Sequence, residues 1–447
     1  MNIEQIYDKG LAHGAYAIES DGKVALVDPG RDPKPFIDFA KKHNAQIVAV
    51  FETHPHADFA SSHLEFQKRF AANIYVNPKV GVAYDHVPME DGDEVKIGKV
   101  TFKAIFTPGH SPDHNTYLLL DEKGKEHAVF TGDSLFVGDV GRPDLREGAG
   151  NINMKKEELA AQMYDTVQNI FVPLPNEVYV YPAHGGGSAC GKSMSMEETY
   201  STIGKEKERN WAMQAQDKAE FINTLLDGQV NIPKYFPYAV EMNRKGFEPF
   251  EESIKKVPRL YTQDSLGDGV LIIDTRKPQS FKKGHMKGAI NIPDGEKFEQ
   301  WLGAIVAPEE AFYLLAESPE KLENMIRKTA KIGYERFIKG ALVVDDTFAL
   351  NEKSQYADVE VLKNQTTNYT ILDIRDDGEV RINKIFKDSI HIPLGQLRER
   401  AHELSLEKPV VVHCAGGYRS AIGSSILESV HNDAVEVLDL GDGVKQF

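Results

Sequence analysis

The chain has 447 residues, more than one hydrophobic core of ordinary size accommodates, so we expect several domains. Lys and Arg number 52 against 68 Asp and Glu, and the net charge of −16 opposes nucleic acid and anionic membrane surfaces as partners. No apolar run is long enough to span a bilayer. These properties favour a soluble protein whose partners are small molecules.

The N-terminal segment and the cysteines predict a cellular location. The first ten residues mix both charge signs and lack the basic start and apolar run of a secretory signal. The two cysteines, Cys190 and Cys414, lie in segments with the patterns of different domains, so a stabilising disulfide is not expected. A reducing compartment suits two free thiols, and we expect the protein in the cytoplasm.

Residues 1–250 alternate short apolar strands with polar loops rich in Gly, Pro, His and Asp. Val24–Val27 and Ile47–Phe51 are two such strands. A more helical, charged stretch follows from Tyr200, and Lys255–Pro258 has the composition of a linker. The pattern predicts one α/β domain that ends near residue 250.

Four predicted strands run directly into potential metal ligands. Ile47–Phe51 is followed by a loop that holds His54, His56 and Asp58. The other three strands lead into the motifs Thr107-Pro-Gly-His110, Thr131-Gly-Asp133 and Pro182-Ala-His184. A lone histidine in such a loop is most often a hydrogen-bonded structural residue, but ligand-type side chains at four strand ends indicate a shared site. Imidazole and carboxylate suit divalent metals such as Zn and Fe.

Together, the motifs HxHxD, TPGH, TGD and PAH resemble the metallo-β-lactamase superfamily. The resemblance implies an αββα sandwich with its metal at the edge of the sheets. One position departs from the superfamily pattern His-x-His-x-Asp-His, because Phe59 stands where the last histidine would be. Phenylalanine cannot bind a metal, so the dinuclear zinc site of hydrolases such as glyoxalase II is not expected to assemble fully.

In persulfide dioxygenases of this superfamily, one ferrous iron is held by the residues that match His54, His110 and Asp133. The resemblance therefore implies one Fe(II) per chain, bound by two histidines and one carboxylate. Such a set leaves positions on iron for O2 and a substrate sulfur. The resemblance also implies that three neighbouring groups orient the ligands by hydrogen bonds without touching iron. These groups are His56, Asp58 and His184.

Three further residues, close to the metal motifs in the sequence, are candidates for contact with a substrate. Arg142 lies in a segment that resembles the loop after the metal-binding aspartate of these dioxygenases, and it either binds substrate or forms a structural ion pair with Asp144. Lys192 either attracts an anionic thiol substrate or is a solvated surface charge. Cys190 either carries or positions a persulfide in catalysis, or it is a buried thiol of no chemical consequence.

The segment Gly186-Gly-Ser-Ala-Cys-Gly-Lys-Ser193 matches the phosphate-binding pattern G-x-x-x-x-G-K-[ST] letter for letter. Such a loop passes directly from a strand into a helix, whereas here Pro182-Ala-His184 intervenes and belongs to the metal pattern. We expect a chance match and no nucleotide binding.

An internal repeat begins beyond residue 250. Leu271–Arg276 with Asn291-Ile-Pro293 is echoed by Ile371–Arg375 with His391-Ile-Pro393. The offset far exceeds the period of roughly 20 to 50 residues of a solenoid repeat, so it predicts a duplicated domain. We expect these two domains at residues 256–350 and 357–447.

The second copy carries a cysteine after a strand. Val410–His413 leads into Cys414-Ala-Gly-Gly-Tyr-Arg419, followed by a predicted helix, and the N–H groups of such a loop and helix start favour a thiolate. The loop resembles the six-residue active-site loop of rhodanese-like sulfurtransferases, which implies catalytic roles for Cys414 and Arg419 in sulfur transfer. Related phosphatases use a longer loop, so the resemblance favours sulfane sulfur over phosphate.

The first copy keeps the framework motif Asp274-Thr-Arg276, but its strand Phe312–Ala316 runs into Glu317-Ser-Pro319 without a cysteine. It cannot form a persulfide in the way the family does, so we expect a structural or docking domain. His285 and His391 are expected to be structural.

The whole arrangement resembles persulfide dioxygenase–rhodanese fusions of the CstB type. It implies oxidation of a thiol persulfide by O2 to thiol and sulfite, with Cys414 moving sulfur between persulfide, sulfite and thiosulfate. The main alternative is a dinuclear zinc thioester hydrolase with accessory rhodanese domains, and a second is a non-catalytic sulfur-carrying scaffold. The carrier thiol (glutathione, coenzyme A or another), the direction of transfer and the oligomeric state, a homo-oligomer included, stay open.

Overall fold

The computed structural model describes residues 1–146, 150, 152, 154–214, 217–229 and 231–447. Contacts among these residues divide the chain into two compact units. The first unit comprises Met1–Glu252 with Lys331–Gly333, and the second comprises Ser253–Ala330 with Tyr334–Phe447. None of the described helices is long and apolar enough to cross a membrane.

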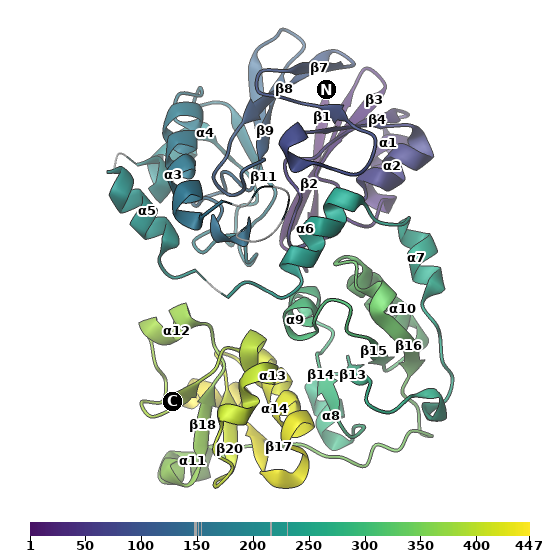
Figure 1. Ribbon diagram of the computed structural model, residues 1–447, viewed down its shortest axis with the longest axis vertical. Coiled ribbons are helices and arrows are strands. Elements are labelled where there is room, and N and C mark those ends of the chain that lie inside the picture. Colours follow the sequence, from purple (N-terminus) through teal and green to yellow (C-terminus); the bar gives the residue numbers. More distant parts are fainter. Residues whose placement is uncertain (147–149, 151, 153, 215–216, 230) are drawn as a thin grey trace. The chain divides into compact units, whose positions relative to one another are not determined.

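The described part of the first unit contains two six-stranded sheets, with orders β1-β2-β3-β4-β5-β6 and β12-β11-β10-β9-β8-β7 (Figure 1). The strands of the first sheet are β1 (Asn2–Asp8), β2 (His13–Ser20), β3 (Lys23–Val27), β4 (Gln46–Phe51), β5 (Asn73–Val76) and β6 (Val87–Pro88). Those of the second are β7 (Glu94–Ile97), β8 (Val100–Phe106), β9 (Asn115–Leu120), β10 (Glu126–Gly132), β11 (Tyr179–Pro182) and β12 (Ser201–Thr202). The predicted strands of this region are therefore present, with ends displaced by a few residues.

An apolar core joins the two sheets. Phe51 of β4 and Phe102 of β8 are both fully buried, and their rings stack with centroids 4.4 Å apart. Burying an aromatic side chain removes a large apolar area from water, so such pairs hold the sheets face to face. The same buried cluster includes Phe130 of β10.

Helices cover the outer face of each sheet. The helices of the first unit are α1 (Lys34–Lys42), α2 (His63–Phe70), α3 (Lys156–Thr166), α4 (Ile203–Arg209), α5 (Lys218–Leu226), α6 (Phe236–Lys245) and α7 (Phe250–Lys256), the last of which continues into the second unit. Phe36 of α1 and Phe66 of α2 pack in one buried cluster with residues of the first sheet. Met163 of α3 and Phe221 of α5 pack in another with the second sheet. The layers confirm the predicted αββα sandwich.

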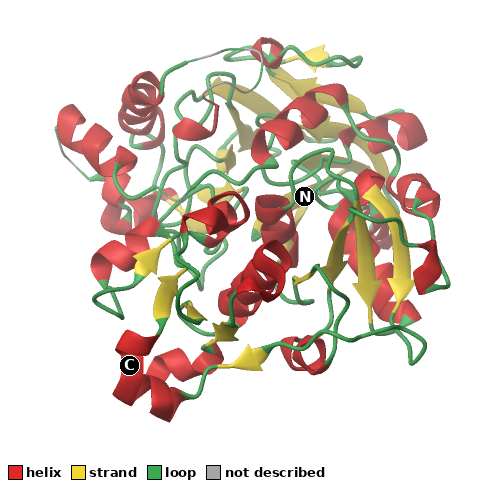
Figure 2. Cartoon of the chain, turned by 60° about the horizontal axis from the view of Figure 1, so that its bottom comes forward, coloured by secondary structure: helices red, strands yellow, loops and turns green. Residues whose placement is uncertain are grey.

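The second unit contains, over its described residues, two sheets whose paired strands run parallel (Figure 2). The first sheet, in the order β14-β13-β15-β16, is made of β13 (Leu271–Asp274), β14 (Ala289–Asn291), β15 (Phe312–Ala316) and β16 (Ile338–Val343). The second, in the order β17-β21-β20-β18-β19, is made of β17 (Gln355–Tyr356), β18 (Thr370–Asp373), β19 (Ile390–His391), β20 (Val410–His413) and β21 (Val437–Asp439). Each copy of the sequence repeat thus builds its own sheet.

The helices of the second unit complete two α/β folds. They are α8 (Pro278–Lys283), α9 (Phe298–Ile305), α10 (Pro319–Ala330), α11 (Val359–Gln365), α12 (Asp377–Ile382), α13 (Leu397–Arg400) and α14 (Tyr418–His431). Helix α14 of the second copy packs on β14 of the first, where the backbone N–H of Asn291 donates to Oγ of Ser425 at 2.9 Å. This contact explains why both copies fall in one compact unit.

Candidate metal centre

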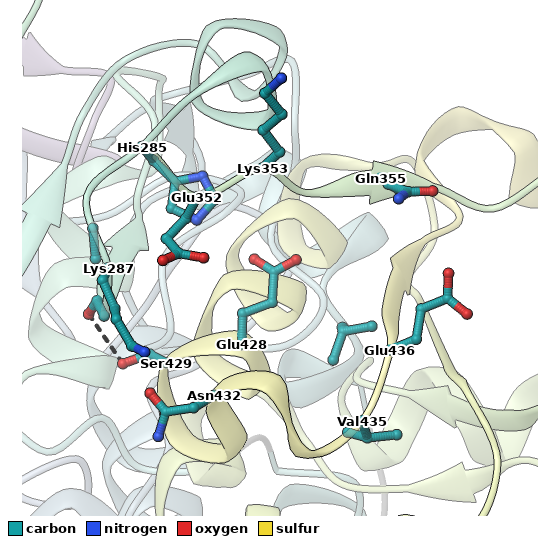
Figure 3. A pocket seen from close by; sticks show the side chains of 13 residues that line it. His285, Lys287, Glu352, Lys353, Gln355, Glu428, Ser429, Asn432, Val435 and Glu436 are labelled. Carbon is teal, nitrogen blue, oxygen red and sulfur yellow. Dashed lines mark hydrogen bonds between the residues drawn. The ribbon is translucent and has the colours of Figure 1, made fainter. Parts of the chain in front are cut away.

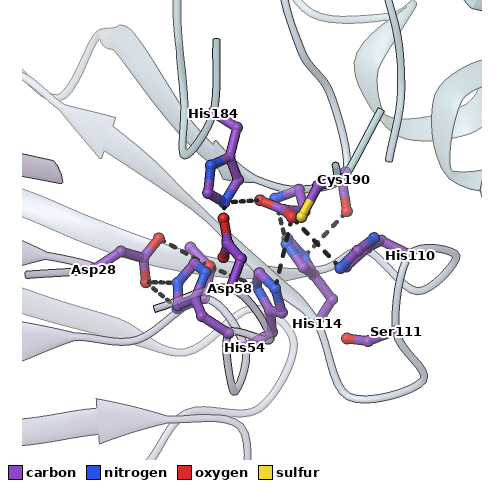
Figure 4. Close-up of polar contacts among 12 residues, drawn as sticks. Asp28, His54, Asp58, His110, Ser111, His114, His184 and Cys190 are labelled. Carbon is purple, nitrogen blue, oxygen red and sulfur yellow. Dashed lines mark hydrogen bonds and ion pairs between the residues drawn. The ribbon is translucent and has the colours of Figure 1, made fainter. Parts of the chain in front are cut away.

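The candidate centre lies where strands of both sheets of the first unit end. His54 follows β4, His110 follows β8 and His184 follows β11 (Figure 4). Asp133 follows β10. Each of the four side chains is 1% exposed. The strands are apolar and buried, so their ends are fixed by the core and hold these groups rigidly. The structure therefore brings the four predicted strand-end groups together.

One donor set surrounds a single carboxylate oxygen. Oδ2 of Asp133 lies 3.5 Å from Nε2 of His110 and 3.9 Å from Nε2 of His54. Nδ1 of His110 faces the carbonyl oxygen of Arg142 at 2.9 Å, and a carbonyl only accepts, so this nitrogen carries the proton. The lone pair of neutral His110 is then on Nε2, the nitrogen that faces Asp133.

The tautomer of His54 is set by a longer chain of hydrogen bonds. Oγ1 of Thr53 donates its one proton to Oδ2 of Asp28 at 2.9 Å, so it accepts from Nδ1 of His54 at 3.0 Å. Asp28 is further fixed because its Oδ1 accepts from the backbone N–H of Thr53 at 2.8 Å. Nε2 of His54 is thereby available as a metal ligand, as in sites where a neighbour orients the histidine.

A second donor set faces the other oxygen of Asp133. Nε2 of His184 lies 3.6 Å from Oδ1 of Asp133 and 3.3 Å from Oδ1 of Asp58. Asp58, His184 and Cys190 also have ligand atoms within 4.8 Å of one another, and all three are buried. His56 forms a third such group with Asp133 and His184. The orienting role of His56, Asp58 and His184 stays a prediction.

The polar atoms at the centre fit a divalent cation. Both carboxylate oxygens of Asp133, Oδ1 of Asp58 and Nε2 of His184 are buried, and none has a hydrogen-bond partner among the described residues. Buried polar groups without partners cost several kcal/mol, so native proteins pair nearly all of them. A metal ion bound by these nitrogen and oxygen atoms would satisfy them, and the donor types suit iron and zinc.

Electrostatics at the centre also favour a cation. Burial alone lowers the pKa of His184, but the negative charges of Asp58 and Asp133 outweigh it and raise the pKa to about 9. Burial raises the pKa of the Cys190 thiol, and the same two carboxylates add to the effect. The centre is thus a concentration of buried negative charge that attracts positive charge.

Phe59 packs beside the centre. It is fully buried, with its ring centroid 3.8 Å from that of His13 and 4.4 Å from that of His56. The ring supplies apolar surface where the superfamily pattern has a histidine donor.

Three residues at the centre were not identified by the sequence reasoning. Asp28 lies near the imidazole of His56, with Oδ1 at 3.1 Å from Nε2. Nε2 of His114 accepts a hydrogen bond from the backbone N–H of Asp133 at 3.1 Å. His13 stacks on Phe59. Only Asp28 carries a usable signal, because Asp28-Pro-Gly30 follows an apolar strand as the other site motifs do.

The structure favours a bracing role for Arg142 over substrate binding. Its side chain is 1% exposed, and Nε and Nη2 each bind Asp144 at 2.7 Å. Nη1 donates to the carbonyl oxygen of Ala189 at 3.3 Å. Because the carbonyl oxygen of Arg142 accepts a hydrogen bond from Nδ1–H of His110, the loop that the Arg142–Asp144 pair holds in place helps to orient a predicted metal ligand.

Lys192 binds backbone carbonyl groups at the end of a helix. Its Nζ donates to the carbonyl oxygens of Thr224 and, at 2.7 Å, Asp227, at the C-terminus of α5. A cation here neutralises the negative end of the helix dipole, which favours the surface role over attraction of substrate. The segment from residue 183 to 200 contains turns and bends and, among its described residues, no helix, so it does not pass directly from a strand into a helix as a phosphate-binding loop does.

In the second unit, Cys414 follows β20 and precedes the 14-residue helix α14. Its Sγ accepts a hydrogen bond from the backbone N–H of Gly417 at 3.1 Å. Gly417 has a φ of 94°, a conformation that glycine adopts without strain. Arg419 in the first turn of α14 binds the carboxylate of Glu379. The loop thus directs an N–H group at the N-terminus of α14 toward the sulfur.

The two histidines predicted to be structural both bind backbone carbonyls. Nδ1 of His285 donates to the carbonyl of Phe281 at 3.0 Å, and the two rings stack 3.9 Å apart. Nε2 of His391 donates to the carbonyl of Arg375 at 2.7 Å.

Comparison with known proteins agrees with this description. The model of the metallo-beta-lactamase superfamily matches residues 9–184, and the model of the rhodanese-like domain matches residues 259–339 and 358–446. The crystal structure of a metallo-beta-lactamase from Staphylococcus aureus subsp. aureus COL is 30% identical, with a TM-score of 0.68, covering 77% of this chain and 98% of that chain.

Two further relatives are similar to part of the chain. The cytoplasmic hydroxyacylglutathione hydrolase of Arabidopsis thaliana is 34% identical over 172 residues, or 37% of this chain, and the match spans 60% of that relative's length. The crystal structure of ETHE1 from Myxococcus xanthus is 29% identical, with a TM-score of 0.47, covering 55% of this chain and 98% of that chain. The chain belongs to the metallo-beta-lactamase superfamily and carries rhodanese-like domains after its metal-binding domain.

Proposed function

We propose that the first unit is a non-haem iron(II) persulfide dioxygenase with one iron per chain, coupled to a rhodanese-like sulfurtransferase at Cys414, in the manner of the CstB-type fusions. The observation that carries the proposal is the set of His54, His110 and Asp133. It is a buried group of two histidines and one carboxylate converging on one point, beside a phenylalanine at the place of a further histidine ligand. Iron in such a set has open positions for O2 and sulfur, the two reactants of the proposed reaction.

The overall reaction is RSSH + O2 + H2O → RSH + SO3²⁻ + 2H⁺, in which the outer sulfur is oxidised and O2 is reduced. Bound iron supplies a site where O2 and the persulfide sulfur meet and exchange electrons. The protein's part is to hold His110 and His54 in the metal-binding tautomer, through the carbonyl of Arg142 and the hydroxyl of Thr53. Burial of the site excludes bulk water from the reactive sulfur.

At Cys414, the thiolate attacks the outer sulfur of a persulfide donor. A new S–S bond to Cys414 forms as the S–S bond of the donor breaks, and the donor thiolate leaves with the electron pair. Sulfite then attacks the outer sulfur of the Cys414 persulfide and releases thiosulfate and the cysteine thiolate. This sequence uses the sulfite made by the dioxygenase, which gives a reason for joining both activities in one chain.

A second candidate function is a zinc thioester hydrolase. It is favoured by the second donor set of Asp58, His184 and Cys190, which faces the free oxygen of Asp133, and by the likeness to hydroxyacylglutathione hydrolases. Two metals sharing a carboxylate would suit hydrolysis by a metal-bound hydroxide. The partner classes differ accordingly, with a persulfide, O2, sulfite and thiosulfate in one case and a thioester in the other.

One experiment separates the two functions. The full chain is loaded anaerobically with iron or with zinc, metal content is measured, and O2 uptake, sulfite and thiosulfate are followed with glutathione persulfide and with coenzyme A persulfide. We expect about one iron per chain and O2 uptake tied to sulfite or thiosulfate. Two tightly bound zinc ions, no O2 uptake and hydrolysis of lactoylglutathione would establish the hydrolase instead.

A further inference from the structure

The second unit contains an arginine–carboxylate pair that occurs in both copies of the repeat. Arg276 binds Asp274 in the first copy and Arg375 binds Asp373 in the second, each with Nη2 to Oδ2 at 2.6 Å. Because the copy without a cysteine keeps this pair with the same geometry, the pair belongs to the fold.

A second arginine–carboxylate pair occurs in the copy that contains Cys414. Nη1 and Nη2 of Arg419 bind Oε2 and Oε1 of Glu379 at 2.5 and 2.7 Å, and Nη1 lies 3.4 Å from Oδ2 of Asp376. This fork-to-fork geometry fixes the guanidinium in both position and orientation.

The repeat shows which residues stand at these positions in the first copy. The backbone N–H of Thr275 donates to the carbonyl of Leu315 as that of Ile374 donates to the carbonyl of His413. Leu315 and His413 are therefore equivalent, and so are the residues that follow them, Ala316 in the first copy and Cys414 in the second.

The Arg419–Glu379 pair has no counterpart at the equivalent positions of the first copy. Five residues after Ala316 stands Lys321, at the position of Arg419, and it binds Asp294 at 3.1 Å. Six residues after Asp274 stands Ser280, at the position of Glu379. The first copy folds without this pair, so the pair accompanies the cysteine and is not a requirement of the fold.

Glu379 is itself held by its helix. Its Oε2 accepts a hydrogen bond from the backbone N–H of Asp376 at 3.1 Å, which forms a capping box at the start of α12. The carboxylate is therefore fixed by one helix while Arg419 belongs to the turn that follows the Cys414 loop. Glu379 ties these two elements together.

Arg419 lies in the first turn of α14, two residues after Gly417, whose backbone N–H donates to Sγ of Cys414. Burial lowers the pKa of Arg419, but the hydrogen bonds and charge of Glu379, followed by the negative charge of Cys414, raise it above its ordinary value. Nε–H of Arg419 donates to no residue that the structure describes, so one edge of the guanidinium is not used by Glu379 or Asp376.

We propose that Glu379 is a positioning residue for sulfur transfer at Cys414: it holds the guanidinium of Arg419 beside the sulfur, where the positive charge stabilises the attacking thiolate. The inference rests on the proposed sulfur transfer and adds a residue outside the active-site loop to it. In the transfer step, the Cys414 thiolate attacks the outer sulfur of the persulfide, the donor S–S bond breaks and the donor thiolate departs. A fixed guanidinium near Cys414 stabilises the negative charge of the attacking sulfur.

The test measures the reactivity of Cys414 alone. Full-length protein is treated with iodoacetamide between pH 5 and 10, and mass spectrometry of the Cys414 peptide gives the alkylation rate at each pH. We expect the Glu379→Gln variant to be alkylated about tenfold more slowly near pH 7, with its profile displaced upward by about one pH unit, because the thiolate fraction falls. Glu379→Asp, which keeps the charge, should restore part of the rate.

A matched control comes from another pair in the same unit. Glu310 binds Arg398 with the same fork, Nη1 to Oε2 and Nη2 to Oε1 both at 2.8 Å, and it takes no part in the Cys414 loop. Glu310→Gln should leave the alkylation profile of Cys414 unchanged. Partial unfolding of Glu379→Gln would have the opposite effect to the one expected, since it exposes a buried cysteine and speeds alkylation.

An alkylation profile in Glu379→Gln equal to that of the wild type and of Glu310→Gln overturns the inference. Faster alkylation overturns it too, when the thermal midpoint of the variant equals that of the wild type. The proposed function is read out separately, as the gain of one sulfur atom on the Cys414 peptide after treatment with glutathione persulfide. A displaced profile in Glu379→Gln supports the positioning role of Glu379 even if the wild type takes up no sulfur, an outcome that overturns only the proposed sulfur transfer.

Discussion

Nε2 of His110 lies 3.5 Å from Oδ2 of Asp133, with both side chains 1% exposed. This relationship predicts which substitutions remove the metal. Asp133→Asn takes away the carboxylate that both donor sets share, so we expect iron content, measured by inductively coupled plasma mass spectrometry, to fall at least tenfold. Asp58→Asn, which alters only the second donor set, should keep about one iron per chain. Loss of iron in Asp58→Asn but not in Asp133→Asn would contradict the assignment.

Phe59 predicts a change of metal stoichiometry. Its ring centroid lies 4.4 Å from that of His56 and 6.4 Å from that of His184, so an imidazole there would add a donor to the second set. We expect Phe59→His to raise zinc uptake from about one to about two ions per chain and to lower O2 uptake in the iron form. Phe59→Leu, which removes the ring and adds no donor, is the control and should leave zinc uptake as in the wild type. Equal uptake in all three proteins would show that residue 59 does not limit metal binding.

The hydrogen bond of Tyr418 predicts that the copy without a cysteine supports the Cys414 loop. Its hydroxyl, in the Cys414 loop, donates to the carbonyl oxygen of Pro293 in the first copy at 2.8 Å. Tyr418→Phe should cost about 1 kcal/mol of stability in the second unit, measured by chemical denaturation, and lower the rate of sulfur uptake by Cys414. Tyr334→Phe breaks a similar bond, to the carbonyl oxygen of Val306, and should lower stability without lowering the rate of uptake. Equal rates of sulfur uptake in Tyr418→Phe and Tyr334→Phe would contradict a role of the first copy in the reaction at Cys414.

Glu428 predicts a pH dependence of stability. It lines a cavity of about 410 Å³ in the second unit, together with Glu352 and Glu436 (Figure 3), and Oε2 of Glu428 accepts from Oγ of Ser354 at 2.7 Å. Burial, with smaller contributions from the charges of Asp439 and Glu352, raises the pKa of Glu428 to about 7, against the weaker opposing effects of Ser354 and Lys282. The folded state therefore binds this proton more tightly than the unfolded state does.

A raised pKa means that the stability from this group is fully present below its unfolded pKa and is lost as pH rises through about 7. We expect the second unit to lose about 1–3 kcal/mol between pH 5 and 8, seen as a falling thermal midpoint. Glu428→Gln should flatten this dependence, whereas Glu436→Gln, in the same cavity, should retain it. A wild-type midpoint that stays level or rises over this range would contradict the sign of the shift.

Much of the architecture could be predicted from local sequence patterns. Apolar runs such as Ile47–Phe51 form strands that pack against the neighbouring sheet on one face and helices on the other, so strands and the polar loops at their ends can be recognised from hydrophobicity. The same holds for the repeat, because Asp274–Arg276 and Asp373–Arg375 carry the same local pairs in both copies. Strand-end histidines and carboxylates pointed to a shared site since parallel strand ends meet at one edge of a sheet.

The partners of these side chains could not be predicted in the same way. Arg142 and Lys192 are charged residues near a metal motif, yet one is buried against Asp144 and the other caps the end of α5. The carboxylate of Asp28 sets the tautomer of His54 through Thr53, although 25 residues separate Asp28 from Thr53. Hydrogen bonds between groups distant in the chain depend on side-chain placement to a fraction of an ångström, which packing of the whole unit determines.

The sequence by itself therefore indicated an α/β domain, a duplicated second domain and the kinds of ligand at the centre, because these follow from periodicity and residue type. The αββα sandwich was implied by the resemblance of its motifs to the metallo-β-lactamase superfamily. Only the tertiary structure decided that the oxygens of Asp133 face two separate donor sets and that Glu379 binds Arg419. Such pairings join residues that no local pattern connects, and they form only when packed helices and strands bring their side chains within bonding distance.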